Sequence, residues 1–142
     1  MSEKADIGEL LGYAATHWRH RLRRDVAARG FPFFSEARAE VLTHVPAEGM
    51  PQAALSTRMG ITKQAVQQHV DQLVADGAVS RESDPNDKRL KIVRLTELGL
   101  RAREEAKRTR RAIEADIRLA VGDKGYKRLR KTLRKLADAR EG

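Results

Sequence analysis

The middle of the chain carries a row of polar side chains suited to contacts with nucleic-acid bases. We predict a helix from about Lys63 to Asp76 whose exposed positions include Lys63, Gln64, Gln67 and Gln68. A glutamine amide can form two hydrogen bonds with the edge of an adenine, and a lysine ammonium is attracted to phosphate. Glutamine is also an ordinary residue of solvent-exposed helices, so the interpretation depends on what surrounds this helix.

A basic, turn-rich segment follows between residues 84 and 99. Its first four residues, Asp-Pro-Asn-Asp, favour a turn, and two cations come directly after them. Apolar and basic residues over 90–95 predict a short strand, and residues 78–82 predict a second one. Together they predict a cationic hairpin, or wing, that projects into solvent. Its candidate DNA-binding residues are Arg81, Asp87, Lys88 and Arg89.

Two short helices and a tight turn must position the glutamines. Pro51 favours the start of a helix that ends near Met59, and Gly60 allows the positive φ of a sharp turn. Thr62 suits the N-cap of the following helix and is a further candidate contact to DNA. The apolar face of that helix should consist of Val66, Val70, Leu73 and Val74. A helix-turn-helix unit places its second helix in the major groove.

Longer helices are predicted on both sides of this unit. A first helix ends at Gly30, a second is capped by Ser35 and ended by Pro46, and a third, long one starts after Thr96 and runs to about residue 121. A break at 122–125 precedes a last helix. Apolar residues recur every three or four positions in the first helix: Ile7, Leu11, Ala14, Trp18, Leu22 and Val26. The last helix has a heptad-like seam: Tyr126, Leu129, Leu133 and Leu136.

The charge of the chain favours a polyanionic partner but is unevenly distributed. The net charge is +9, and 15 of the 29 Lys and Arg residues, against 7 of the 20 Asp and Glu residues, lie in 101–142. The excess therefore belongs to the C-terminal helices and not to the predicted wing. It is either the solvated surface of long helices or a long-range field that speeds association with DNA.

Several other classes of function are excluded by composition. With no Cys, the chain has no disulfide, thiolate metal site or cysteine redox sensor. We recognise no signal peptide and no apolar run near the ~20 residues of a membrane span, so we expect a soluble, cytoplasmic protein without a membrane partner. There is no Gly-rich phosphate loop, nucleophile elbow or evident pair of catalytic acids, so we expect neither an enzyme nor a bound cofactor.

The motifs around the glutamine helix resemble those of the MarR family, the multiple-antibiotic-resistance regulators. The resemblance rests on Met59-Gly60-Ile61-Thr62, on the wing run from Asp84 to Arg89, which is similar to the family pattern D-x-x-D-x-R, and on Leu95-Thr96-Glu97-Leu98-Gly99. It implies a mainly α fold with a small β-hairpin wing, in which a winged helix-turn-helix is flanked by N- and C-terminal dimerisation helices. We expect one domain over residues 1–142, with the winged helix at 35–95 and dimerisation helices at 1–30 and 97–142.

The resemblance also implies roles for individual residues. Arg89 would reach the minor groove, and Asp87 would pair with it and fix its direction; an ordinary surface ion pair is the alternative. A homodimer would bind a pseudo-palindromic site in double-stranded DNA, with one recognition helix in each half-site. The expected dimerisation residues are Ile7, Leu10, Leu11, Tyr126, Leu129, Leu133 and Leu136.

A ligand or metal site is a further hypothesis for the first helix. Family members often respond to anionic aromatic compounds, for which Trp18 offers a stacking surface and Arg19 a cation; Trp18 is also explained as a core residue. His17 and His20 share a helix face, but two histidines without an evident third ligand are more simply surface residues, and we predict no metal site.

The sequence therefore favours a sequence-specific DNA-binding transcription regulator, of the ligand-responsive repressor type. The alternative is an architectural protein that binds nucleic acid with little sequence preference, through its charge. The glutamine-lined helix favours the first interpretation, because charge alone carries no base preference.

Overall fold

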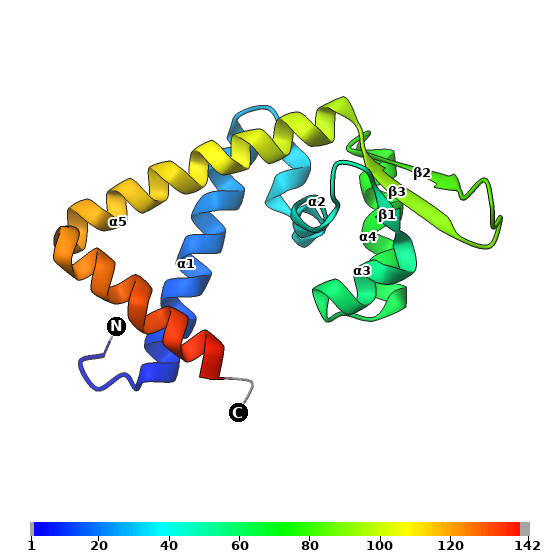
Figure 1. Ribbon diagram of the computed structural model, residues 1–142. Coiled ribbons are helices and arrows are strands. Elements are labelled where there is room, and N and C mark those ends of the chain that lie inside the picture. The colour runs from blue at the N-terminus through cyan, green and yellow to red at the C-terminus, as the bar shows by residue number, and fades with distance from the viewer. Residues whose placement is uncertain (1, 140–142) are drawn as a thin grey trace.

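A winged helix and two helical arms make up the structure (Figure 1). The computed structural model describes residues 2–139. The elements in chain order are α1 Ile7–Ala28, two short 3₁₀ helices Pro32–Ser35 and Ala37–Glu40, α2 Val41–His44, β1 Met50–Pro51, α3 Gln52–Met59, α4 Lys63–Ala75, β2 Val79–Ser83, β3 Lys91–Leu95 and α5 Glu97–Asp138. This is the predicted fold class, mainly helical with a small β wing.

Helix α1 begins at a capping box and is buried only near its C-terminal end. The Asp6 carboxylate accepts the backbone N–H of Glu9 at 2.9 Å, and the Glu9 carboxylate accepts the N–H of Asp6 at 3.0 Å. The helix stops before Gly30, whose φ of 102° is the left-handed conformation expected of a helix-ending glycine. Leu22 and Val26 are buried, while the N-terminal half leads away from the winged helix (Figure 1).

The segment after α1 differs from the predicted helix that starts at Ser35. Two 3₁₀ helices precede a single α-helical turn, and Glu36 between them has an extended backbone. The Ser35 hydroxyl donates to the carbonyl of Pro32 at 2.9 Å instead of capping a helix. Phe33 and Phe34 are both buried, and their insertion into the core requires tight turns where a regular helix would leave one of them outside.

Helices α3 and α4 form the predicted helix-turn-helix. Gly60 between them has φ 68°, and the Thr62 hydroxyl accepts the N–H of Ala65 at 3.0 Å as the N-cap of α4. Val66, Val70 and Leu73 are buried as predicted. The prediction that Val74 is buried was wrong: it is 40% exposed, because the helical period turns it to the edge of the apolar stripe.

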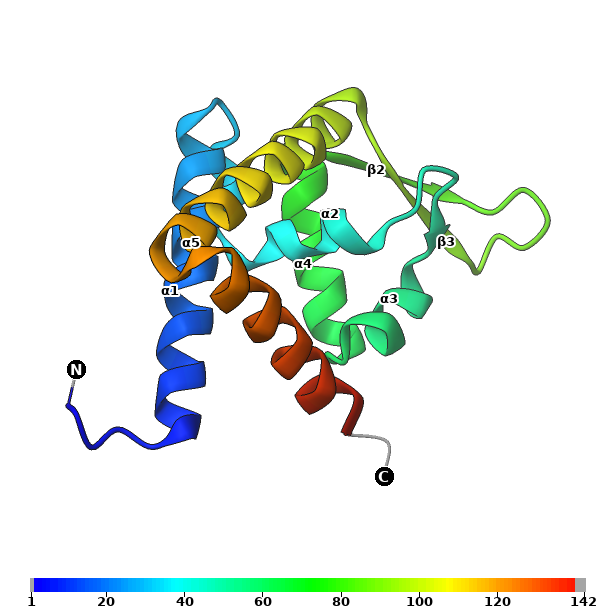
Figure 2. The same cartoon turned by 60° about the vertical axis from the view of Figure 1, so that its left-hand side comes forward.

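The wing belongs to a three-stranded antiparallel sheet of order β1-β3-β2. Its hairpin pairs Val79 with Leu95 and Ser83 with Lys91. The third strand, β1, was not predicted; it is two residues long and pairs Met50 with Val93. The hairpin extends away from both helical arms in either view (Figures 1 and 2).

Helix α5 starts at the base of the wing and carries the chain back over α1. Its N-cap is Thr96, whose hydroxyl accepts the N–H of Gly99 at 3.2 Å and donates to the carbonyl of Gly77 at 2.6 Å. A Cβ on Gly99 would lie only 2.0 Å from the carbonyl oxygen of Ala78, so this approach requires glycine.

The predicted break in the C-terminal region is a kink at one residue. Gly122, with φ 77° and ψ 162°, is the non-helical residue inside α5, and the predicted interruption over 122–125 is correspondingly shorter. Beyond the kink the helix changes direction sharply, and in Figure 2 its last turns lie apart from the N-terminal end of α1. An ion pair between Arg21 and Asp116 joins α1 to α5 before the kink.

Candidate nucleic-acid interface

The exposed face of α4 carries the polar residues that the sequence analysis selected. Lys63, Gln64, Gln67 and Gln68 are exposed, as is the capping residue Thr62. The buried valines on the opposite face hold this surface toward solvent. The helix therefore presents its N-terminal turns outward, as a groove-binding helix must.

Asp84 and Asp87 organise the tip of the wing. The Asp84 carboxylate accepts the N–H groups of Asn86 at 2.7 Å and of Asp87 at 3.2 Å, an Asx-type turn. Asp87 in turn accepts the backbone N–H of Arg89 at 3.0 Å and its side-chain Nε at 3.2 Å. The Arg89 side chain is 91% exposed, so its contact with Asp87 limits its direction without removing it from solvent.

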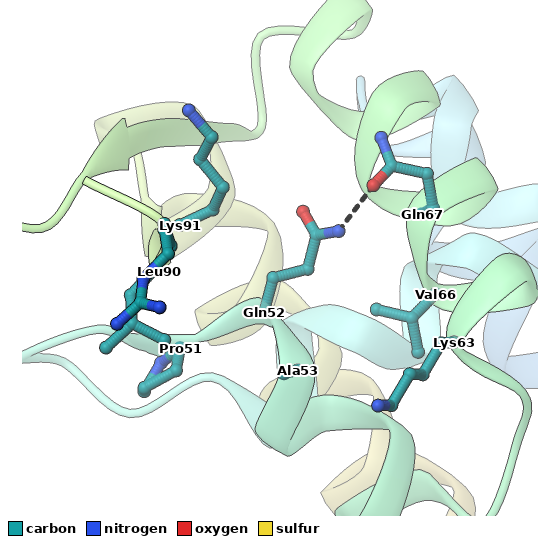
Figure 3. A pocket seen from close by; sticks show the side chains of 9 residues that line it. Pro51, Gln52, Ala53, Lys63, Val66, Gln67, Leu90 and Lys91 are labelled. Carbon is teal, nitrogen blue, oxygen red and sulfur yellow. Dashed lines mark hydrogen bonds between the residues drawn. The ribbon is translucent and has the colours of Figure 1, made fainter. Parts of the chain in front are cut away.

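A shallow cavity of about 210 Å³ separates α4 from the wing. Lys63 and Gln67 of α4 line one side and Lys91 lines the other, with Gln52 of α3 between them (Figure 3). Arg89 also lines this cavity. Three of these five side chains are cationic, which suits a polyanion that contacts the helix and the wing together. Lys88 is exposed beside Arg89.

Arg81 lies between the helix and the wing and does not project freely. Its Nη1 is 2.6 Å from a carboxylate oxygen of Asp71 on α4 and 3.2 Å from the amide oxygen of Gln52 on α3. The hydrogen bond from Arg81, and next that from Gln67, hold the pKa of Asp71 below its ordinary value. Gln52 and Asp71 are not recognisable from the sequence as partners of Arg81, because the contacts join residues up to 29 positions apart.

Comparison with known proteins identifies the fold and its family. The MarR family model matches residues 37–90. The HTH-type transcriptional regulator YdgJ of Bacillus subtilis (strain 168), itself uncharacterised, is 37% identical over 75 residues, which are 52% of this chain and 46% of the relative. The match thus spans about half the length of that curated relative.

Solved structures match over almost the whole chain. A MarR-family regulator from Rhodococcus sp. RHA1 has a TM-score of 0.72 at 27% identity, covering 96% of this chain and 97% of that one. CouR from Rhodococcus jostii RHA1, solved with p-coumaroyl-CoA bound, has a TM-score of 0.68 at 26% identity, covering 96% and 95%. Residues 37–90 thus match the MarR family, and the structure has the fold of MarR-family regulators over almost the whole chain. Members of the MarR family are transcription regulators with a DNA-binding winged helix, not enzymes.

Outside the winged helix, the MarR-family fold leaves an apolar surface on the arms. Ile7 is 70% exposed, and Leu10, Leu11, Leu129, Leu133 and Leu136 are exposed as well. Tyr126 departs from the predicted seam: it is buried in its own chain, with the Arg118 guanidinium 4.5 Å from its ring centre. The kink at Gly122 explains the difference, because it folds Tyr126 against the preceding part of α5.

The candidate ligand residues line a small cavity between α1, the 3₁₀ segment, α2 and α5. The cavity measures about 140 Å³, and its walls include Trp18, Arg19, Arg23, Glu40 and Arg110. Arg110 was not selected from the sequence, where it is one cation among many. Burial lowers its pKa, so the cavity holds a partly desolvated cation beside the half-buried Trp18 ring.

Metal and membrane interpretations receive no structural support in the described range. Residues 2–139 contain no group of three His, Asp or Glu side chains placed to hold a metal ion. His17 and His20 are exposed on α1. No helix within the described range is sufficiently long and apolar to span a bilayer.

Proposed function

We propose that the protein is a cytoplasmic, ligand-responsive repressor that binds a pseudo-palindromic site in double-stranded DNA as a homodimer. The observation that carries this proposal is the exposed glutamine face of α4 beside the cationic wing tip. In this proposal the winged helix at 35–95 binds DNA, and the segments 1–30 and 97–142 form the dimer.

Base contacts come from the first turns of α4. Gln64 and Gln68 are exposed there, with Lys63 beside them and the Thr62 cap at the end of the helix. Each amide offers one donor and one acceptor, which matches the N7 and N6 groups of adenine. Lys63 and the N-terminal end of the helix contact phosphate, which sets the register of the glutamines along the groove.

The wing contacts the neighbouring minor groove. Arg89 is exposed and is oriented through its backbone and side-chain contacts with Asp87, and a guanidinium suits the negative potential of a narrow minor groove. Lys88 lies next to it and contacts phosphate. Arg81 contributes from the base of the wing, where it is held against α4.

The exposed leucines of the arms support the dimer. Water contact with such an apolar surface costs about 25 cal/mol per Å², which a second subunit would remove. Ile7, Leu10 and Leu11 of α1 face solvent together with the leucines beyond the kink of α5. A two-fold axis through these arms would place two recognition helices about 34–36 Å apart, one turn of DNA.

An effector site is supported by the cavity beside Trp18. The ring, Arg19 and the partly buried Arg110 suit an aromatic anion, and the related CouR was solved with an aromatic acyl-CoA bound. A ligand lowers DNA affinity only if it binds the state that does not bind DNA more tightly. Calorimetry with an aromatic carboxylate such as salicylate tests the effector site. If no binding is measured at millimolar ligand, aromatic carboxylates are excluded as effectors.

A competition assay tests the proposed function. DNA selected by the purified protein from a random pool should bind about 10³-fold or more tightly than random DNA of the same length. An architectural protein would bind both equally and would yield no consensus from the selection. Gln64→Ala should weaken the preferred site by about 1–3 kcal/mol and relax the preference at one base pair.

A further inference from the structure

Four side chains from three elements close a ring of three hydrogen bonds and one ion pair beside the recognition face. Arg81 of β2 forms an ion pair with Asp71 at 2.6 Å and donates to the amide oxygen of Gln52 at 3.2 Å. The Gln52 amide nitrogen donates to the Gln67 oxygen at 2.7 Å, and the Gln67 nitrogen donates to Asp71 at 2.9 Å. Figure 3 shows the central bond of this ring, between Gln52 and Gln67.

The chemistry of the two charged members determines the direction of every bond. A guanidinium only donates, so the oxygen of Gln52 must face Arg81 and its nitrogen must face Gln67. A carboxylate only accepts, so the nitrogen of Gln67 must face Asp71 and its oxygen must face Gln52. The two requirements meet at the Gln52–Gln67 bond and agree there, with the nitrogen of one amide facing the oxygen of the other. The donors and acceptors are therefore mutually consistent around the whole ring.

This ring engages both ends of the Gln67 amide. A glutamine that reads adenine needs its nitrogen and its oxygen aimed at one base edge. In Gln67 one N–H is directed to Asp71 and the oxygen accepts from Gln52, so these two bonds fix the orientation of the amide and it is not free to turn toward a base edge. Gln64 and Gln68 are exposed on the same helix, and among residues 2–139 neither amide is held by a partner of this kind.

We infer that Gln67 is a positioning residue, and that the Gln52–Gln67–Asp71–Arg81 ring sets the angle between the recognition helix and the wing while Gln64 and Gln68 contact the bases. The ring joins the start of α3, the middle of α4 and the third residue of β2, and therefore spans the elements that must meet DNA together. Arg81 is paired opposite Val93 on β3, so the ring acts on both strands of the wing. This inference rests on the proposed sequence-specific function.

The first experiment measures the ring in the free, full-length protein. The pH titration of the Asp71 carboxylate is followed by NMR in wild-type protein and in Gln67→Ala, Arg81→Ala and Gln64→Ala variants. Loss of a hydrogen bond to the charged carboxylate raises its pKa, so the midpoint should rise in Arg81→Ala and in Gln67→Ala. Gln64→Ala, a matched glutamine variant outside the ring, should leave it unchanged. An unchanged midpoint in Gln67→Ala would refute the ring.

The second experiment compares the DNA preferences of the same variants. Gln67→Ala and Gln52→Ala should weaken the preferred site and random DNA by the same factor and select the wild-type consensus. Gln64→Ala should instead lose about 5- to 150-fold of its preference at one base pair. The double variant, with both Gln52→Ala and Gln67→Ala, should lose less DNA affinity than the sum of the losses in the two single variants, because either substitution alone already disrupts the ring.

The outcomes of the two experiments are separable. If Gln67→Ala relaxes one base pair while Gln52→Ala leaves the consensus intact, Gln67 contacts that base directly and the inference is wrong. If the wild-type protein selects no consensus, the proposed function fails, and the Asp71 titration still decides whether the ring exists.

Discussion

Charged side chains are used differently in the winged helix and in the part of α5 beyond the kink at Gly122. In the winged helix, Arg81 pairs with Asp71 at 2.6 Å, and Arg38 pairs with Asp76 at 2.7 Å. Beyond the kink, residues 123–139 contain only two acids, Asp123 and Asp138. The cations of that segment are Lys124, Lys127, Arg128, Arg130, Lys131, Arg134 and Lys135. An ion pair fixes the positions of its two side chains, whereas a row of cations with few acids nearby produces a positive electrostatic field.

Apolar side chains show the same division. Leu55, Val66, Val70 and Leu73 of the helix-turn-helix are buried within the chain, while Leu129 and its neighbours on the arm face solvent. The core of the winged helix thus continues into α1 and the first half of α5, through Leu22, Val26 and Ala106, whereas the leucines beyond the kink are left exposed. From this comparison we expect the chain to separate DNA recognition, in the winged helix, from dimerisation and long-range attraction, in the arms, and the following experiments test that expectation.

The largest effect should come from removing the chain from residue 123 onward. We expect the dimer at micromolar concentration, and with it high-affinity DNA binding, to be lost, because both half-sites are needed together. Leu133→Ser should weaken the dimer in the full-length chain, and Lys131→Ser, two residues away, is the matched control. Sedimentation equilibrium measures both, and a full-length mass near 16 kDa would contradict the dimer.

A glycine substitution at the junction of the two regions should destabilise the fold. Gly99→Ala places a Cβ 2.0 Å from the Ala78 carbonyl oxygen, so the base of the wing must shift. We expect a loss of about 1–3 kcal/mol in the free energy of unfolding. Gly12→Ala on α1 meets no atom within 4 Å and should stabilise by about 0.5–1 kcal/mol. Denaturant unfolding measures both variants. If Gly99→Ala changed the free energy of unfolding as Gly12→Ala does, residue 99 would not lie close to the Ala78 carbonyl oxygen.

Substitution at the wing tip should affect binding without affecting stability. Arg89→Ala removes the exposed cation, which should weaken DNA binding strongly and reduce the salt slope by about 1. Its thermal stability should stay within about 0.5 kcal/mol of wild type. Asp87→Ala should weaken binding less, because it removes only the contact that orients Arg89. A folded Arg89→Ala protein with wild-type affinity would contradict the role of the wing.

The smallest effect should come from the cations of the arm. Arg130→Ala combined with Arg134→Ala should slow association with DNA at low salt and leave the selected consensus unchanged, because a long-range field carries no base preference. Stopped-flow association rates at two salt concentrations measure this effect. A changed consensus would instead place these residues on the bases.

Local signals made much of the recognition unit predictable from the sequence. Thr62 and Thr96 cap the helices that follow them, and Gly60 forms the turn between α3 and α4. Asp84 organises the wing tip through contacts with residues at most three positions away. Patterns of this kind act over one or two turns of chain, so the order of residues is enough to predict them. The same applies to the buried valines of α4, whose spacing follows the helical period.

Contacts between distant segments decided the rest. Strand β1 exists because Met50 meets Val93, Arg110 is partly desolvated because α1 and α2 cover it, and Tyr126 is buried because the kink at Gly122 folds it back. The ring that engages Gln67 joins residues 15 and 29 positions apart. A free glutamine and a glutamine held by internal hydrogen bonds look the same in the local sequence. Only the tertiary structure places the hydrogen-bond partners that distinguish them.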